Sequence, residues 1–442
     1  MKNQRDFPYK YIMNKFESTG DNYYDIGFKY AGPILFLYTW WVLLEANRKG
    51  IKRLYFIARD GYPLYEIANI FVEKFNLDIE CKYLYCSRKA LILPSINESF
   101  QDELVNLTKY SAKSTINILL DRIDATIEQK KIIINDLENN NIKIDIDKIL
   151  TISEHQTIQN ILVNSSVYIN ILKSNASINY NLTVSYLKQE GLYDNNLIYI
   201  VDIGWAGSIQ KYLEKIINIE SPNAKIFAFY FGTLYSKYLK NNEHKYKAWY
   251  FDNKKHHIAR AMFSVNIMES ICTAPHGTTK AYKKIGNKYE PVLSEIDKNL
   301  SIITEKINTG IIDFTKKIIL FNNFEDFKNK PLHKITFKLC YKLMYAPSIS
   351  IVDCFSNFTH CDDITSSYTL PLIDDRDIKA LHYYQIPTLF YYKITKKQYK
   401  NDYKALMWPY GVASKLPFVK KIWYRLNILM IHYVRYKKLI NL

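Results

Sequence analysis

The chain lacks the cysteine patterns of disulfide scaffolds and zinc sites. Its six cysteines are spread over 442 residues, and none forms a Cys-x-x-Cys pair. Disulfide-rich domains need a denser cysteine framework, and structural zinc sites repeat cysteine or histidine at short spacing. We therefore expect a protein that folds around a hydrophobic core in a reducing cytoplasm.

Long apolar runs are also missing. The first ten residues, "MKNQRDFPYK", contain no apolar signal core, and the longest apolar stretch covers only Gly32–Leu44. A helix that spans a bilayer needs about 20 apolar residues. We therefore expect neither an export signal nor a membrane span.

Established nucleotide motifs are missing as well. No G-x-G-x-x-G follows a strand-like segment and no G-x-x-x-x-G-K-[ST] occurs, so the Rossmann and P-loop fingerprints are excluded. A haloacid-dehalogenase-type phosphatase would need two Asp two residues apart after its first strand. The segment "RDGYP" offers only Asp60 there, and a sugar-phosphate phosphatase is kept as an alternative.

Acidic residues are outnumbered by basic ones. The chain has 60 Lys and Arg against 43 Asp and Glu, a net charge of +17. This excess favours nucleic acid, phosphorylated small molecules or an anionic membrane surface as partners. The basic residues are spread along the chain without a zinc-finger or RNA-recognition pattern, so we expect no nucleic-acid partner.

What the chain does contain is an alternation of apolar strand-like segments with helical ones. In the segment after the first strand, Leu64, Ile67 and Phe71 share one face, and Pro63 suits a first helical turn. The alternation predicts an α/β fold with a mainly parallel sheet. The expected strands are "LYFIA" (54–58), "CKYLYC" (81–86), "LIYIVDI" (197–203) and "AKIFAFYFG" (224–232).

The same patterns suggest three regions. We expect an α/β core over 21–235, with a helical insertion at about 98–190. An accessory or acceptor-side region would cover 236–350, and a basic, aromatic and helical C-terminal region would cover 351–442. No Gly/Ser-rich linker separates them.

Three loops at expected strand ends carry unusual residues: "ARDGY" (58–62), "CSRKA" (86–90) and "VDIGWAGS" (201–208). In an open α/β sheet the carboxyl ends of the strands form one ligand-binding edge. Two Asp, two Arg and a Lys at that edge suit a phosphorylated ligand with a divalent metal.

The third loop is the most informative. Asp202 ends an apolar strand, and the small residues Gly204, Ala206 and Gly207 allow backbone N–H groups to approach a phosphate. Gly207 and Ser208 open a helix, whose N-terminus favours anions. The structural alternative is an ordinary Asp/Gly-rich turn with Ser208 as N-cap.

The segment "IYIVDIGWAGSIQ" resembles the ribose-phosphate loop of type I phosphoribosyltransferases. Asp202 matches the second of the family's two acidic positions and Gly207 its loop glycine. Val201 stands at the first acidic position, and Trp205 and Ala206 replace the usual threonines. The segment "IARDGYPL" resembles the family's pyrophosphate loop, with Asp60 in place of a glycine.

A closer resemblance is to phosphoribosyltransferase-like glycosyltransferases of bacterial surface-polysaccharide biosynthesis. It covers about 25–280 and rests on "GFKYAGPIL", "FIARDGYPLYEIA", "YLYCSRKAL" and "VDIGWAGSIQ", in this order. The resemblance implies a pentosyltransferase with a type I phosphoribosyltransferase-like core. It would transfer ribofuranosyl 5-phosphate from phosphoribosyl pyrophosphate to a glycan acceptor and release pyrophosphate, and a partner phosphatase would then remove the 5-phosphate.

The resemblance also implies roles for the loop residues. Asp60 would contact Mg²⁺ or its waters, and the backbone of Asp60 and Gly61 would hold the pyrophosphate. Arg59 and Arg88, with Lys89 as a weaker candidate, would stabilise the leaving group. Asp202 would bind ribose hydroxyls, and the 5-phosphate would lie on the loop residues Gly204, Trp205, Ala206, Gly207 and Ser208.

Structural alternatives stand beside these roles. Arg59 and Asp60 could form a surface ion pair at a turn, and Arg88 and Lys89 could be solvated charges. A non-catalytic module that binds phosphoribosyl pyrophosphate or assists polysaccharide assembly is a further alternative to the transferase.

The segment "MESICTAPHGTTKAY" offers candidates for the acceptor side. Glu269 or His276 could serve as the base that takes the acceptor proton or as a contact to the acceptor. A helix followed by a structural turn is the alternative.

The C-terminal segment "VKKIWYRLNILMIHYVRYKK" combines Trp423 and several aliphatic residues with Lys and Arg. A basic amphipathic helix of this kind binds anionic membrane interfaces. We expect it to hold the protein at the inner face of the cytoplasmic membrane, where a lipid-linked acceptor would lie. A packing helix with a solvated basic face is the alternative.

Overall fold

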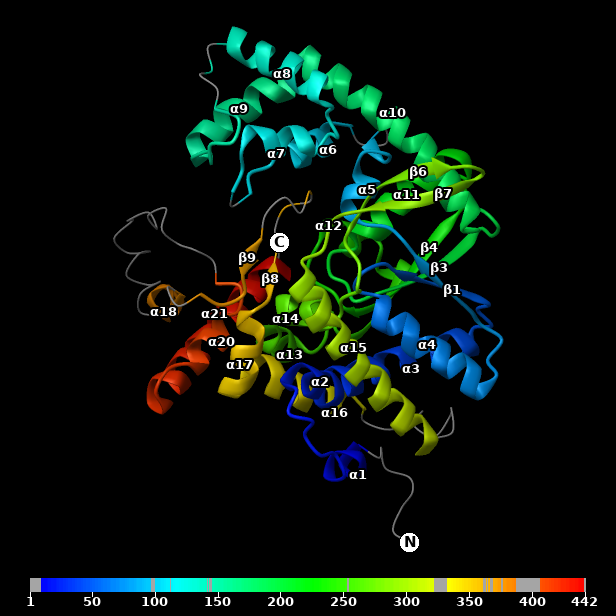
Figure 1. Ribbon diagram of the computed structural model, residues 1–442, viewed down its shortest axis with the longest axis vertical. Coiled ribbons are helices and arrows are strands. Elements are labelled where there is room, and N and C mark those ends of the chain that lie inside the picture. The colour runs from blue at the N-terminus through cyan, green and yellow to red at the C-terminus, as the bar shows by residue number, and fades with distance from the viewer. Residues whose placement is uncertain are drawn as a thin grey trace.

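The chain is described by a computed structural model (Figure 1). The structure describes residues 9–96, 100–111, 113–140, 142, 145–252, 254–321, 332–360, 363, 365, 369–374, 377–386 and 406–440.

The centre of the fold is a sheet of five parallel strands in the order β2-β1-β3-β4-β5. The strands are β1 (Arg53–Ile57), β2 (Glu80–Leu84), β3 (Leu197–Asp202), β4 (Lys225–Gly232) and β5 (Tyr246–Phe251). The predicted α/β class with a parallel sheet is confirmed, and the four predicted strands are present. The sheet continues past residue 235, the predicted end of the core, because β5 pairs with β4.

The strand side chains divide the interior into two cores. Leu54 and Phe56 of β1 point into one core, whereas Tyr55 and Ile57 point into the other. Alternation of this kind follows from the pleat of a strand. Because both faces are covered, the inner strands β1, β3 and β4 are apolar along most of their length rather than on one side only.

Helices cover both faces of the sheet. One core includes side chains of α3 (Gly32–Arg48), α4 (Tyr62–Phe75) and α15 (Lys298–Ile318). The other includes side chains of α5 (Arg88–Ile92), α10 (Ser166–Gln189) and α11 (Ser208–Glu220).

Helix α4 shows why the sequence starts and ends a helix where it does. Pro63 lies in its first turn, where a missing N–H costs no intrahelical hydrogen bond. Leu64, Ile67 and Phe71 are buried on one face. Asn76 ends the helix in the left-handed conformation, with φ of 48°.

In the described residues between α5 and β3 there are five helices: α6 (Phe100–Leu107), α7 (Ile116–Asp121), α8 (Ile127–Asn139), α9 (Ile152–Asn164) and α10. Figure 1 shows α6 to α10 arching over one end of the molecule. A buried ion pair between Arg122 and Asp363 joins this helical region to the C-terminal part of the chain.

The remaining elements surround this frame. A hairpin of β6 (Thr279–Ile285) and β7 (Lys288–Leu293) and the two-residue strands β8 (Thr359–His360) and β9 (Leu370–Pro371) were not predicted. The other helices of the described ranges are α1 (Tyr9–Asn14), α2 (Asn22–Ile26), η1 (Gly27–Ala31), α12 (Lys237–Asn241), η3 (Glu243–Lys245), α13 (His257–Met262), α14 (Val265–Ile271), η4 (Ile319–Phe321), α16 (Leu332–Cys340), η5 (Tyr341–Tyr345), α17 (Ile349–Ser356), α18 (Asp377–Ala380), η6 (Leu381–Tyr384), α20 (Pro409–Ser414) and α21 (Phe418–Ile440).

Candidate functional site

The candidate site lies where the strand order reverses. Strand β1 pairs with β2 on one side and with β3 on the other. After β1 the next strand of the sheet, β2, lies on one side, whereas after β3 the next strand, β4, lies on the opposite side. In doubly wound sheets the carboxyl ends of two such strands flank the ligand crevice. Residues 58–61 follow β1 and residues 203–207 follow β3, so two of the three singled-out loops flank this switch point.

Asp60 follows β1 with one carboxylate oxygen buried. Its Oδ1 accepts no hydrogen bond in the described part of the chain, and Nε of Arg59 lies 3.7 Å away, too far for a hydrogen bond. Burial raises the pKa of Asp60 to about 7, a shift that the Arg59 charge opposes and the Glu269 charge reinforces. Arg59 and Asp60 do form the ion pair of the structural alternative, at 3.7 Å, but the Asp60 side chain is only 23% exposed and its Oδ1 is buried.

Asp202 ends β3 with its side chain 6% exposed. Burial, followed by the nearby Asp60 charge, raises the pKa of Asp202 well above its usual range, although the N–H groups of Ile203 and Gly204 donate to its carboxylate. The Tyr38 hydroxyl donates to the Asp202 carbonyl oxygen at 2.8 Å, which fixes the strand end against α3. The structure thus brings the two predicted acidic residues close enough to interact.

Glu269 adds a third carboxylate from α14. The indole Nε1 of Trp205 donates to its Oε1 at 2.9 Å, and Nδ1 of His360 lies 3.4 Å from its Oε2. The charge of Glu269 acts on both Asp60 and Asp202. Trp205 therefore connects the loop after β3 to Glu269, which makes this predicted acceptor-side residue part of the same site.

A metal ion was predicted here with Asp60 as ligand. In the described ranges, no three His, Cys, Asp or Glu side chains are arranged to hold a metal by themselves. Mg²⁺ is commonly held by one or two carboxylates and completes its shell with substrate phosphates and water. A buried carboxylate oxygen without a hydrogen bond, beside a second carboxylate that repels it, fits such an ion.

Arg59 lies in the left-handed region, with φ of 71°, which is uncommon for a residue with a side chain. Its backbone N–H donates to the Tyr83 hydroxyl at 2.8 Å, and its Nη1 donates to Oγ1 of Thr278 at 3.0 Å. Both contacts hold the loop after β1 in this conformation, and they connect it to the segment that contains His276.

His276 belongs to the same hydrogen-bond chain. Its Nδ1 lies 2.8 Å from the Gly277 carbonyl, which can only accept, so Nδ1 carries the proton. Its Nε2 then accepts from the Tyr83 hydroxyl at 2.7 Å. Burial lowers the pKa of His276, which agrees with a neutral ring. Both ring nitrogens are engaged, so His276 holds the loops together rather than standing free as a base.

The loop after β3 approaches its neighbours closely. Gly204 has φ of 136°, and a Cβ there would lie 2.2 Å from the Gly232 carbonyl oxygen. Gly207 has φ of 73° and precedes α11 as its N-cap residue, with no side-chain cap. The hydroxyl of Ser236 donates to the Ala206 carbonyl at 2.8 Å. The loop is thus a compact, glycine-dependent turn that β4 and the segment after it support.

Ser208 is the first residue of α11 rather than its N-cap, so the N-cap alternative for this residue is wrong. The Lys211 N–H bonds the Gly207 carbonyl at 2.9 Å. The N–H groups of residues 208–210 donate to no group in the described part of the chain. This end of α11 can therefore receive an anion.

Of the remaining predicted residues, Gly61 and Arg88 lie near the site, whereas Lys89 does not. Gly61 opens α4, and a Cβ there would lie 2.4 Å from the Ile57 carbonyl oxygen. Arg88 is exposed at the start of α5, and its charge acts on Asp60. Lys89 is buried, and its ammonium donates to Asp124 and to two carbonyls of the helical region. Lys89 therefore anchors that region, and we do not include it in the site.

Tyr83 was not among the predicted site residues. Its partners Arg59 and His276 lie 24 and 193 residues away in the sequence. The only local signal is its place on a strand that ends in the singled-out "CSRKA" loop.

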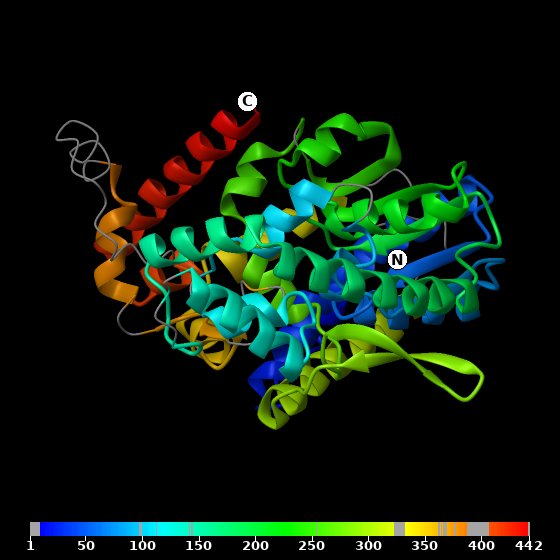
Figure 2. The same ribbon diagram turned by 90° about the horizontal axis from the view of Figure 1, so that it is seen from above.

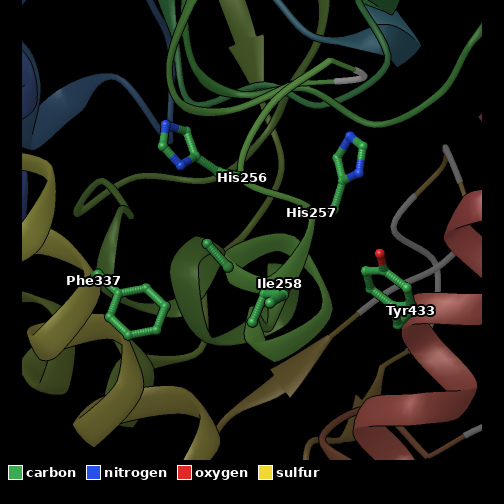
Figure 3. Close-up of a pocket in the computed structure, with 6 residues that line it drawn as sticks. His256, His257, Ile258, Phe337 and Tyr433 are labelled. Atoms are coloured by element: carbon green, nitrogen blue, oxygen red, sulfur yellow. The ribbon is translucent and has the colours of Figure 1, made fainter.

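Two hollows on the surface lie elsewhere. One, of about 470 Å³, is lined by His256, His257, Ile258, Ala259, Phe337 and Tyr433 (Figure 3). The other, of about 500 Å³, is lined by Gly20, Asp21, Asn22, Tyr23, Lys306, Ser350, Asp353, Cys354 and Asn357. Neither includes a residue of the candidate site.

Comparison with protein-family models finds no match, and comparison with curated proteins finds no significant relative. None of the helices in the described ranges combines the length and apolar content needed to cross a bilayer.

Proposed function

We propose that this chain is a phosphoribosyltransferase-like glycosyltransferase. It would transfer ribofuranosyl 5-phosphate from phosphoribosyl pyrophosphate to a surface-polysaccharide acceptor and release pyrophosphate. The observation that carries this proposal is the placement of Asp60 and Asp202 at the carboxyl ends of the adjacent parallel strands β1 and β3, on either side of the switch point. Ligands of doubly wound sheets bind at this position.

The two ends of the donor would meet different groups. At the pyrophosphate end, the buried Asp60 oxygen would hold Mg²⁺, which offsets charge on the leaving group. Arg59 and the exposed Arg88 would contact pyrophosphate oxygens. At the ribose end, Asp202 would accept hydrogen bonds from ribose hydroxyls, while Gly207 and the N-terminus of α11 would receive the 5-phosphate.

In the reaction, the bond between ribose C1 and the pyrophosphate oxygen breaks, and C1 forms a bond to the acceptor oxygen. Charge develops on the leaving group, where fixed cations stabilise it most. The acceptor proton must leave its hydroxyl. Glu269 is the carboxylate we propose for it, because Nε2 of His276 already accepts from Tyr83.

Transfer can be followed with donor labelled in the ribose. The protein, Mg²⁺ and a glycolipid extract of the cells that make it should yield labelled glycolipid and an equal amount of pyrophosphate. Donor binding without transfer would indicate the non-catalytic module instead. Release of phosphate from sugar phosphates without any donor would indicate the phosphatase.

A further inference from the structure

The C-terminal helix α21 presents an uncovered apolar face. Seven large apolar side chains along it are between 43% and 77% exposed. Most are spaced by three or four residues, so they lie on one side of the helix. They are Phe418, Val419, Ile422, Trp423, Leu426, Met430 and Val434, and we refer to them as the α21 apolar face. Soluble proteins rarely leave so continuous a row of apolar side chains in water.

The opposite side of α21 is fixed to the protein. Ile428 and Ile431 are buried. The Asn427 side chain accepts from the Ile386 N–H at 2.9 Å, and the Tyr436 hydroxyl donates to the Asp252 carbonyl at 2.8 Å. Because packing and hydrogen bonds hold the helix between Asn427 and Tyr436, the apolar face has a defined direction. Figure 2 shows α21, in red, along the outer edge of the molecule.

The positive charge of the C-terminal segment indicates what kind of surface covers the α21 apolar face. Residues 403–442 contain eight Lys and Arg and no Asp or Glu. On α21, Lys420 and Arg435 are exposed. A second copy of the chain would bring the same positive charges against this face, which disfavours it as the occupant. An anionic lipid surface complements both features, because its headgroups attract the basic side chains and its acyl chains accept the apolar ones.

We propose that α21 lies in the surface of an anionic lipid bilayer, with the α21 apolar face among the acyl chains. Tyr433 then lies at the headgroup level, where an aromatic ring with a polar atom is favoured. The basic side chains reach the anionic headgroups. The helix binds to the surface and does not span the bilayer.

The hollow beside α13 adjoins this helix. Tyr433 of α21 and Ile258 of α13 line it together, and Ile258 is 56% exposed (Figure 3). The binding surface therefore continues from α21 onto α13. This proposal goes beyond the transferase and does not rest on it, since lipid binding requires none of the donor site.

The test is flotation of the full-length protein with vesicles. Vesicles of phosphatidylcholine and phosphatidylglycerol at about three to one should carry the protein, and vesicles of phosphatidylcholine alone should carry far less. Raising the salt from about 0.1 to 0.5 M should weaken binding, because it screens the charges. Equal binding to both vesicles, or none to the anionic ones, would overturn the proposal.

The variant Trp423→Gln/Leu426→Gln/Met430→Gln removes the centre of the face and should reduce anionic-vesicle binding at least tenfold. A matched control, Ile127→Gln/Ile178→Gln/Leu197→Gln, changes three exposed apolar residues elsewhere and should bind like the wild type. A variant that binds as the wild type does would contradict the proposal.

Two measurements without lipid test whether a second copy of the chain, or another segment of the same chain, covers the α21 apolar face instead. A wild-type dimer that the α21 triple variant converts to monomer would show that a second copy covers the face. A fall of about 10 °C or more in melting temperature, in the triple variant but not in the control, would show that the chain covers it. Residues 387–405, outside the described ranges, would be the candidate segment. Either result overturns the proposal.

Discussion

The Tyr83 hydroxyl lies 2.7 Å from Nε2 of His276 and donates to it. The same hydroxyl accepts from the Arg59 N–H, so one side chain connects the loop after β1 to the loop before β6. Tyr83 therefore positions Arg59, and under the proposed function it would act on the donor through the conformation of that residue.

Replacement of Tyr83 by Phe should leave the Arg59 N–H and Nε2 of His276 without their partner. We expect a loss of about 1–3 kcal/mol in the free energy of unfolding, the usual cost of unpaired buried polar groups. Affinity for phosphoribosyl pyrophosphate should fall at least fivefold. Urea unfolding and donor titration measure the two effects.

Tyr65→Phe is the matched control. Tyr65 packs against Tyr83 at 5.6 Å between ring centroids, and its hydroxyl forms no hydrogen bond in the described part of the chain. Equal effects of the two substitutions would show that ring packing, rather than the hydrogen-bond chain, holds the loop.

Asp60 predicts a pH dependence of stability. Burial raises its pKa from an ordinary value near 3.8 to about 7 in the folded protein. Between about pH 4 and pH 7 the folded state therefore holds a proton that the unfolded state has lost, and this contribution to stability falls as pH rises. Asp60→Asn removes it.

The two proteins should accordingly differ little at pH 4.5, whereas Asp60→Asn should be the more stable at pH 8 without Mg²⁺. The expected difference is about 2–4 kcal/mol, from about 1.4 kcal/mol for each pH unit of the shift. Urea unfolding at both values in EDTA measures it. A difference that does not change with pH would contradict the raised pKa of Asp60.

Gly204 should not accept a side chain. Its φ of 136° and the 2.2 Å approach of a Cβ to the Gly232 carbonyl predict that Gly204→Ala displaces the loop after β3. We expect a loss above about 2 kcal/mol in stability, because strain and a backbone clash add together. Donor affinity should fall as well.

Gly50 provides the comparison, because its φ is also positive, at 64°, but a Cβ there meets nothing within 4 Å. Gly50→Ala should cost only about 1–2 kcal/mol, the price of the left-handed conformation. Melting curves of both variants test the difference, and a Gly204→Ala protein as stable as Gly50→Ala would show that the close approach is absent.

Arg88 and Lys89 are adjacent in sequence but should behave oppositely. Arg88→Ala should leave stability unchanged and weaken donor binding at least tenfold, since Arg88 is exposed and its charge acts on Asp60. Lys89→Ala should lower stability by about 1–3 kcal/mol, because it removes the buried ammonium from the half-buried Asp124 carboxylate and from two carbonyls. Melting curves and donor titration of both variants measure this. An Arg88→Ala protein that is destabilised but binds the donor normally would contradict the prediction.

Regular secondary structure and the site loops could be predicted because their signals are local. The apolar runs before Asp60 and Asp202, and Pro63 in a first turn, indicate strand, loop and helix over a few residues. The adjacent β1 and β3 then bring Asp60 and Asp202 together.

Contacts between distant segments could not be predicted in this way. The sequence shows two adjacent basic residues at 88 and 89, but only the position of Asp124 decides that Lys89 is buried. The partner of Trp205, Glu269, lies 64 residues away. Strand β5, "YKAWYF", was missed although the turn formers Asn241 and Asn242 precede it and Asp252 and Asn253 follow it.

The central claim is that Asp202 and Mg²⁺ take part in binding phosphoribosyl pyrophosphate, and calorimetric titration of the donor tests it most directly. The wild type should bind with Mg²⁺ present and at least tenfold more weakly in EDTA. Asp202→Asn should lose binding while unfolding as cooperatively as the wild type. Asp78→Asn, which changes an exposed carboxylate before β2 at the other edge of the sheet, should bind normally. No heat of binding from the wild type, with or without Mg²⁺, would contradict the account.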